Sequence, residues 1–215
     1  MSAAGAASNP AAAGVGLSAG AALRSPQFLV LGLTFFACCA AHSGPIFHMV
    51  SYAIGCGIPA MAAVSIYSLE GLSGLGGRLL LGILADRLGV KRVLIGGLLL
   101  QSFAIGSYLF VNQLGEFYAL SVVFGTAYGG VMPLYAVLAR EYFGQRIMGT
   151  VFGAATMTSS IGMAFGPLAG GFLFDTFNGY GWLYVGSFAV GLAAAAIALA
   201  FPPLPSLRAM RLQPA

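Results

Sequence analysis

The feature of this sequence that most constrains its fold is the distance between its charged residues. Asp, Glu, Lys and Arg make up only 7% of the 215 residues, and none occurs in residues 93–115, 117–139, 147–174 or 176–207. A helix needs about 20 mostly apolar residues to cross the hydrocarbon core of a bilayer, so each of these stretches can supply one crossing. So few charges cannot cover a soluble core with a polar surface. We therefore expect a multi-pass membrane protein with the lipid bilayer as its solvent.

Two further crossings are predicted between residues 25 and 85. This stretch carries only Glu70 and Arg78, and residues 55–59 interrupt it with a glycine and proline turn signal. We therefore predict an all-α protein. Its six transmembrane helices should cover residues 28–54, 59–84, 93–111, 117–138, 149–174 and 181–201. The membrane domain then occupies residues 23–201, between a flexible leader rich in Ala and Gly at 1–22 and a short tail at 202–215.

The cations are distributed unevenly over this topology. Eight of the nine Lys and Arg residues lie in the leader, the tail and the two loops on the same side. The loops on the opposite side, residues 55–58, 112–116 and 175–180, contain none. Because cytoplasmic loops carry an excess of Lys and Arg, both termini are predicted to be cytoplasmic. The net charge of +4 is thereby explained by topology, and nucleic acid is not expected as a partner.

The loop between the second and third predicted helices carries a recognisable motif. Residues 82–92 read GILADRLGVKR, which resembles the cytoplasmic loop signature of the major facilitator superfamily. The matching positions are Gly82, Asp86, Arg87, Gly89, Lys91 and Arg92. We expect Gly82 to allow close helix packing and Asp86 to cap or complement a neighbouring helix N-terminus. The cations should hold the loop at the anionic inner leaflet.

Further stretches resemble the C-terminal half of monocarboxylate transporter-like and oxalate/formate antiporter-like members. They are residues 44–48 with Tyr52, Gly77 with Arg78, residues 141–153 and residues 166–175. The resemblance implies a six-helix half with a 3+3 inverted repeat, in a plasma or inner membrane. It implies alternating-access transport of a small, monocarboxylate-like organic anion, without a cofactor or an enzymatic activity. Since such transporters have two halves, a second half or a second copy of this chain is the expected partner.

Glu70 and Arg78 are the first functional candidates, because a charge within the hydrocarbon core costs about 3 kcal/mol on insertion scales. The resemblance implies that Arg78 binds a substrate carboxylate with its planar guanidinium. Alternatively, Arg78 snorkels to the inner interface or anchors loop packing. A carboxyl near mid-membrane makes Glu70 a candidate for proton coupling. Monocarboxylate transporters carry an aspartate where Gly74 stands here, so their coupling scheme does not transfer.

Several residues of the first predicted helix could also be functional. His42 and His48 lie about 240° apart on a helix, so both cannot line one narrow path. We expect His48 and Tyr52, which share a face, to line the substrate path, with a satisfied core histidine as the alternative for His48. Cys38 and Cys39 lie four and three residues before His42 and could share a face with it. Because adjacent cysteines diverge on a helix and there is no second ligand cluster, no metal site is predicted.

Pairs of glycines four residues apart are typical of close crossings between membrane helices. We predict such crossings at three sets: Gly125 and Gly129; Gly149 and Gly153; and Gly162, Gly166 and Gly170.

Two alternative functions belong to classes other than transport. Residues 71–74 read GLSG, like an intramembrane serine protease, but both histidines precede Ser73 although those enzymes place the base after it, so a protease is not predicted. The other alternative is a non-transporting accessory or remnant half that docks on another membrane protein. It would bind that protein and give no flux alone.

Overall fold

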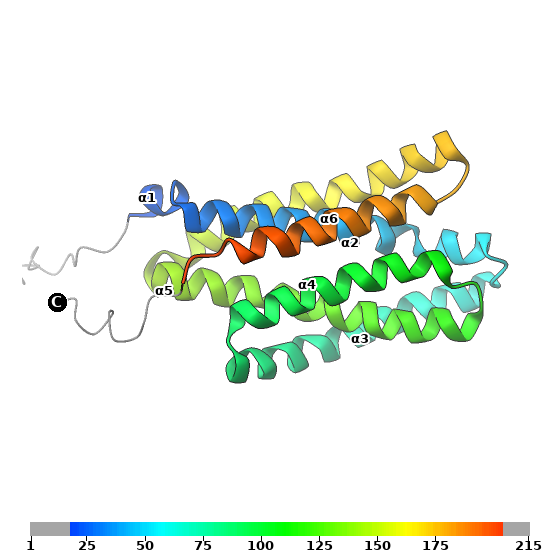
Figure 1. Ribbon diagram of the computed structural model, residues 1–215, viewed down its shortest axis with the longest axis horizontal. Helices are drawn as coiled ribbons and strands as arrows, with labels where there is room; N and C mark the ends of the chain where they lie inside the picture. The colour runs from blue at the N-terminus through cyan, green and yellow to red at the C-terminus, as the bar shows by residue number, and fades with distance from the viewer. Residues whose placement is uncertain (1–17, 204–215) are drawn as a thin grey trace, which may run out of the picture.

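The computed structural model describes residues 18–203, whose long helices run along one common axis (Figure 1). The helices are α1 (Ala19–Leu23), α2 (Pro26–Gly55), α3 (Ala60–Leu88), α4 (Val90–Ser107), α5 (Leu114–Phe177) and α6 (Gly181–Leu199), with a short 3₁₀ turn, η2 (Tyr108–Phe110). The expected all-helical fold is confirmed. Most of the predicted leader and tail, residues 1–17 and 204–215, lies outside the described residues. The last residues of the leader belong to α1, where Ala22 is buried.

Local sequence signals explain where the helices begin and turn. The Ser25 side chain accepts a hydrogen bond from the Phe28 N–H and caps α2, and Pro26 occupies the first turn, where its missing N–H costs nothing. The predicted turn after α2 is present, with Gly57 at a φ of +86°. Gly89, at a φ of +89°, separates α3 from α4. Glycine adopts these angles without the steric cost that a Cβ would add.

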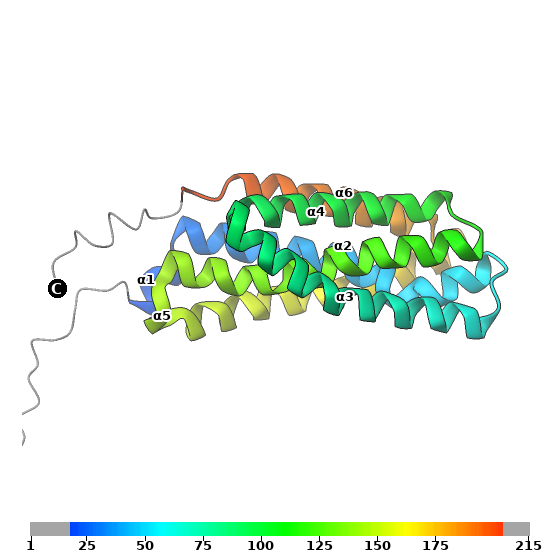
Figure 2. The same cartoon turned by 90° about the horizontal axis from the view of Figure 1, so that it is seen from below.

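The element α5 contains a sharp bend. Gly144 has a φ of +73° and a non-helical ψ, and the chain folds back there (Figures 1 and 2). Residues 114–143, the first arm, and residues 145–177, the second arm, therefore run in opposite directions along the bundle. They contain the predicted helices 117–138 and 149–174.

Four helices within residues 18–203 are long and apolar enough to cross a membrane: α2, Val90–Phe110, α5 and α6. The helix α3 is not among them; it carries Glu70 and Arg78. The six predicted crossings require α3 and each arm of α5 to cross separately, so their number and the orientation of the termini remain predictions.

One end of the bundle, which we call the basic end, gathers α1, the α3–α4 turn, the bend of α5 and the end of α6 (Figures 1 and 2). Its cations are Arg24, Arg87, Lys91, Arg92, Arg140 and Arg146. The Lys91 ammonium donates to the Leu199 and Phe201 carbonyls, and the Tyr142 hydroxyl donates to the Pro202 carbonyl. Burial, together with the Glu141 charge, raises the pKa of Tyr142, so its hydroxyl keeps its proton at neutral pH. Lys91, which was expected to interact with the lipid headgroups, also caps the C-terminal end of α6 through its two hydrogen bonds.

The structure corrects two expectations for the loop motif. A Cβ added at Gly82 would meet no atom within 4 Å, so this glycine makes no close helix contact among the described residues. Asp86 is exposed and does not cap α4, where Gly89 takes the N-cap position without a side-chain hydrogen bond. That the Asp86 charge complements a helix N-terminus stays a prediction.

The glycine sets behave differently from one another. Gly125 and Gly129 contact α3, and Gly162, Gly166 and Gly170 contact α2, so crossings occur at both sets as predicted. The prediction for Gly149 and Gly153 is wrong within residues 18–203, because a Cβ at either would meet open space. Both glycines lie just after the bend of α5. A four-residue spacing of glycines therefore does not by itself predict a helix crossing.

Candidate functional site

Glu70 is buried near the middle of α3, with 1% of its surface exposed. Neither carboxylate oxygen makes a hydrogen bond to another atom of the described chain. Gly125 of the first arm packs directly on this turn of α3, where a Cβ would overlap the Glu70 carbonyl oxygen. The close approach of the two backbones thus encloses the carboxyl, because no side chain on Gly125 holds the helices apart.

Two buried tyrosines accompany this carboxyl. Tyr108 lies in η2 and Tyr184 on α6, and neither hydroxyl has a hydrogen-bond partner among the described residues. Their ring centroids are 5.4 Å apart, and each interacts electrostatically with Glu70. Sequence reasoning missed both tyrosines, since they are distant from Glu70 in sequence and no spacing pattern connects them to it.

Tyr128 of the first arm lies between the two charges of α3. Its half-buried side chain interacts electrostatically with both Glu70 and Arg78. Gly74 lies one turn from each of them, and a Cβ there would be 3.6 Å from the Tyr128 hydroxyl and 3.3 Å from the Gly125 carbonyl oxygen. The position that carries an aspartate in monocarboxylate transporters is therefore a helix-crossing position in this chain.

Arg78 lies on the exposed surface of α3. It makes no hydrogen bond or ion pair within residues 18–203, and its neighbours Leu75 and Leu79 are exposed as well. The structure therefore presents a guanidinium group on an otherwise apolar surface. In the low dielectric of a membrane such a group attracts an anion strongly.

His48 and Tyr52 are engaged in packing α2 against its neighbours. The His48 Nε2 lies 3.1 Å from the Pro167 carbonyl oxygen and donates to it, and the Tyr52 hydroxyl donates to the Tyr108 carbonyl over 2.8 Å. The Tyr180 ring contacts both side chains, with centroids 5.0 Å from His48 and 6.3 Å from Tyr52. The structure therefore brings these two predicted site residues together.

Arg78 is not part of that group. Tyr52 lies close to the end of α2 and lines a cavity of about 400 Å³ there, at the end of the bundle opposite the basic end. Arg78 lies in the other half of α3, and roughly 20 Å of helix axis separate the two residues. The three residues predicted to bind substrate therefore lie at two separate locations in this chain.

His42 is buried between α2 and the first arm. Its Nδ1 lies 3.9 Å from the Cys38 sulfur, and its ring centroid lies 5.5 Å from that of Tyr128. Within residues 18–203, no three His, Cys, Asp or Glu side chains gather where they could hold a metal ion.

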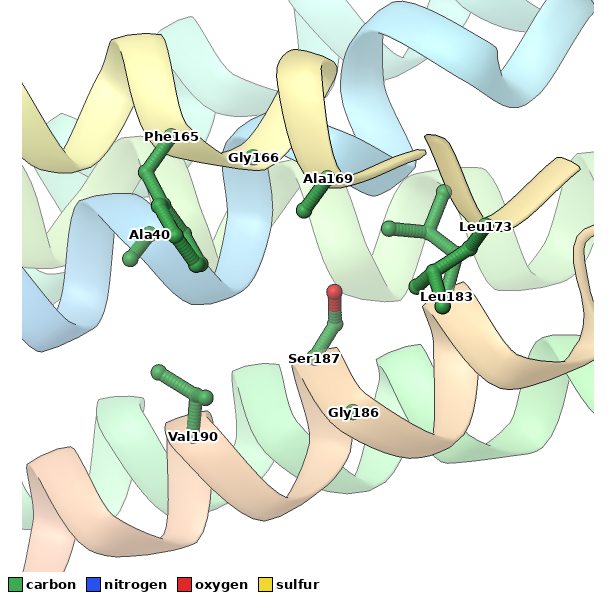
Figure 3. A pocket seen from close by; sticks show the side chains of 9 residues that line it. All are labelled: Ala40, Phe165, Gly166, Ala169, Leu173, Leu183, Gly186, Ser187 and Val190. Carbon is green, nitrogen blue, oxygen red and sulfur yellow. The ribbon is translucent and has the colours of Figure 1, made fainter. Parts of the chain in front are cut away.

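Another cavity, of about 200 Å³, lies between α2, the second arm and α6 (Figure 3). Phe165 and Leu183 are among its apolar walls, and the Ser187 hydroxyl points into it. None of the predicted site residues lines it. An apolar space of this kind does not suit an anion.

Known proteins resemble this chain over most of its length. The sequence matches the Major Facilitator Superfamily over residues 3–167 and, in an overlapping match, over residues 77–213. An uncharacterized MFS-type transporter of Bacillus subtilis, YuxJ, is 34% identical over 119 residues, which cover 54% of this chain and 30% of the relative. Monocarboxylate transporter 12-B of Danio rerio is 27% identical over 165 residues, covering 74% of this chain and 34% of the relative.

A third relative is named for a different activity. The multidrug resistance protein B homolog of Mycobacterium tuberculosis is 32% identical over 125 residues, covering 56% of this chain and 22% of the relative. The matched segments therefore span about a third or less of each of these three transporters.

Proposed function

The chain belongs to the Major Facilitator Superfamily, and on that premise we propose that it forms one half of a carrier for a small organic anion. Its relatives are membrane transporters and not enzymes, and this chain is a multi-pass membrane protein of the same family. The observation that carries the choice of an anion is Arg78. Its guanidinium lies on the apolar surface of α3 and makes no hydrogen bond or ion pair within residues 18–203.

A single arginine suits a substrate with one carboxylate. The planar fork of the guanidinium can donate two parallel hydrogen bonds to that group. The similarity to a protein named monocarboxylate transporter supports the same substrate class. On the second arm, residues 145–177 contain no lysine that could hold a second carboxylate.

The remainder of the substrate path requires a second half. The surface of α3 around Arg78 is lined by exposed leucines, and in the proposal it faces another half, from a second chain or a second copy, across the path. His48 and Tyr52 act at the opposite mouth of that path, beside the cavity that Tyr52 lines. Six crossings, cytoplasmic termini and residence in a plasma or inner membrane complete the proposal.

The test is uptake of labelled formate, lactate and oxalate into proteoliposomes, with and without a pH gradient. We expect saturable uptake of the monocarboxylates and at least about a tenfold loss in Arg78→Ala, since losing a charge-assisted bond of about 1.4 kcal/mol or more weakens binding tenfold. Arg78→Lys keeps the charge but not the fork, and should fall between the two. Arg140→Ala, which removes an exposed cation at the basic end, is the matched control.

Uptake that is unchanged in Arg78→Ala would contradict the role of Arg78. A folded chain that binds lactate without transporting it would show that the second half is missing. A folded chain that neither binds nor transports these anions, but assembles with a complete transporter, would favour the accessory role.

A further inference from the structure

A groove lies between α3 and α4 and begins at the basic end. Its volume is about 320 Å³, and its lining is apolar except for Arg92. Leu84 and Leu88 of α3 and Leu100 of α4 are exposed along it. From Arg92 to Leu100 it follows α4 for roughly 12 Å. Since Val90–Phe110 is long and apolar enough to cross a membrane, the groove runs from the basic end into the hydrocarbon core.

Two adjacent glycines of α4 shape this groove in different ways. A Cβ added at Gly96 would meet no atom within 4 Å, so the groove is open in front of this residue. Gly97 is buried, and a Cβ there would overlap the side chain of Val131 on the first arm. The protein therefore closes the base of the groove and leaves its outer side open. A lipid acyl chain is narrow, flexible and apolar, and it gains dispersion contacts by filling such a space.

Arg92 is the charged residue in the lining of the groove. It is exposed in the first turn of α4 and makes no hydrogen bond or ion pair within residues 18–203. The neighbouring Lys91 donates to carbonyls at the end of α6. Asp86 and Arg87 of α3 are also exposed, but neither lines the groove. The Arg92 guanidinium is therefore available to an anion, and its forked donors match the geometry of a phosphate.

The start of α4 favours an anion at the same end of the groove. Gly89 provides no side-chain hydrogen bond at the N-cap position, and the first turn contains no acidic residue. The first N–H groups of a helix lack partners within the helix, and the positive end of its dipole lies there, so a phosphate is stabilised at this position. The Arg92 charge, the start of α4 and the apolar groove thus meet at one turn of helix.

We propose that this groove is a binding site for one phospholipid with an anionic headgroup. One acyl chain lies along α4 as far as Leu100, and the phosphate binds Arg92. A free phosphate would use Arg92 without the leucines, and an uncharged lipid would use the leucines without Arg92, whereas a phospholipid uses both. A headgroup with an ammonium group is disfavoured, because it would add a cation beside Arg87 and Arg92. The site needs a membrane but not the proposed transport, and Arg78 does not line it.

The test is native mass spectrometry of the full chain in detergent with added phosphatidylglycerol or phosphatidylcholine. We expect one phosphatidylglycerol to bind about fivefold more tightly, since a cation beside an anionic headgroup contributes about 1 kcal/mol. Arg92→Gln should remove this preference, and Gly96→Leu, whose side chain fills the groove, should weaken the binding of both lipids. The matched controls are Arg140→Gln, an exposed cation at the basic end, and Gly149→Leu, a glycine open to space; neither residue lines the groove.

Circular dichroism of each variant separates a lost site from a lost fold. Equal binding of the two phospholipids, or the same loss in Arg140→Gln as in Arg92→Gln, would overturn the proposal. Unchanged binding in Gly96→Leu would also overturn it, because a general attraction of cations to anionic lipid needs no groove. Glycerol phosphate that displaces phosphatidylglycerol would show a phosphate site in its place. A dimer of the chain that forms without lipid and is lost in Gly96→Leu would assign the groove to a second copy.

Discussion

The two arms of α5 each cross another helix through glycines, and they do so in different ways. The first arm meets α3 with glycine on both sides: Gly125 and Gly129 face the backbone of Glu70 and Gly74. In the other direction, Gly77 of α3 faces the backbone of the first arm. We call this contact the first seam. Two backbones lie against each other along its length.

The second arm crosses α2 at a contact that we call the second seam. Along this seam, side chains of α2 increasingly replace backbone atoms as the neighbours of the glycines. Gly162 still faces the backbone of Phe36, but Gly166 faces the Ser43 hydroxyl as well as backbone, and Gly170 faces the His48 ring. Side chains of α2 also donate across this seam to the Gly162 and Pro167 carbonyls. The first seam is therefore a contact between two backbones on the helix that carries Glu70 and Arg78. Part of the second seam, by contrast, consists of side chains that can change rotamer.

The largest effect is expected from Gly77→Ala in the first seam. The added Cβ would overlap the Thr126 carbonyl oxygen, and a backbone atom cannot rotate away. We expect a loss of about 3 kcal/mol in the free energy of unfolding, measured by denaturant titration in mixed micelles. The adjacent Gly76→Ala is the matched control, because its Cβ meets nothing within 4 Å. Equal stability of the two variants would show that the first seam tolerates side chains.

An intermediate effect is expected from Gly170→Ala in the second seam. Its Cβ would meet the His48 ring, and we expect a cost of about 2 kcal/mol in the same titration. The double variant with His48→Ala should recover part of that cost, since the colliding ring is gone, giving a coupling energy of about 1 kcal/mol. Gly171→Ala, next in sequence and open to space, is the control. If the effects of Gly170→Ala and His48→Ala on stability were additive, the proposed difference between the two seams would be contradicted.

The smallest effect is expected from Ser43→Ala. The Ser43 hydroxyl donates across the second seam to the Gly162 carbonyl over 3.4 Å, a long hydrogen bond. We expect its loss to cost about 0.5 kcal/mol, at the low end for one hydrogen bond. In Ser73→Ala the lost bond runs within α3, to the Leu69 carbonyl, and the change in stability should be near zero. A larger loss of stability in Ser73→Ala than in Ser43→Ala would show that the hydrogen bond within α3 contributes more than the one across the second seam.

The long intervals without charge predicted the helices well, because in a membrane protein most charged residues lie close to the helix ends. The predicted helix at 28–54 corresponds to α2 (Pro26–Gly55), and that at 181–201 to α6 (Gly181–Leu199). The bend was located only as a loop between two helices. Nothing in the pattern showed that residues on both sides of Gly144 would stay helical up to it.

The candidate site was predictable in part. Glu70 and Arg78 stand out because charge is rare in such a sequence, and the structure places one inside and the other outside the bundle. That difference depends on which side of α3 faces the first arm. Apolar residues lie on every side of α3, so its sequence does not identify the buried face. Tyr108 and Tyr184, which interact electrostatically with Glu70, were missed because residues of η2 and α6 come near α3 only through tertiary packing.

The first seam also has a consequence for how this sequence can vary between descendants. The neighbour of Gly77 is a carbonyl oxygen, which every amino acid carries, so no mutation at Thr126 can make room for a larger residue at 77. Gly170 and His48, by contrast, can be exchanged in two successive mutations, with the smaller side chain arising first. Lineages of this protein should therefore drift at the outer part of the second seam while keeping glycine at 77.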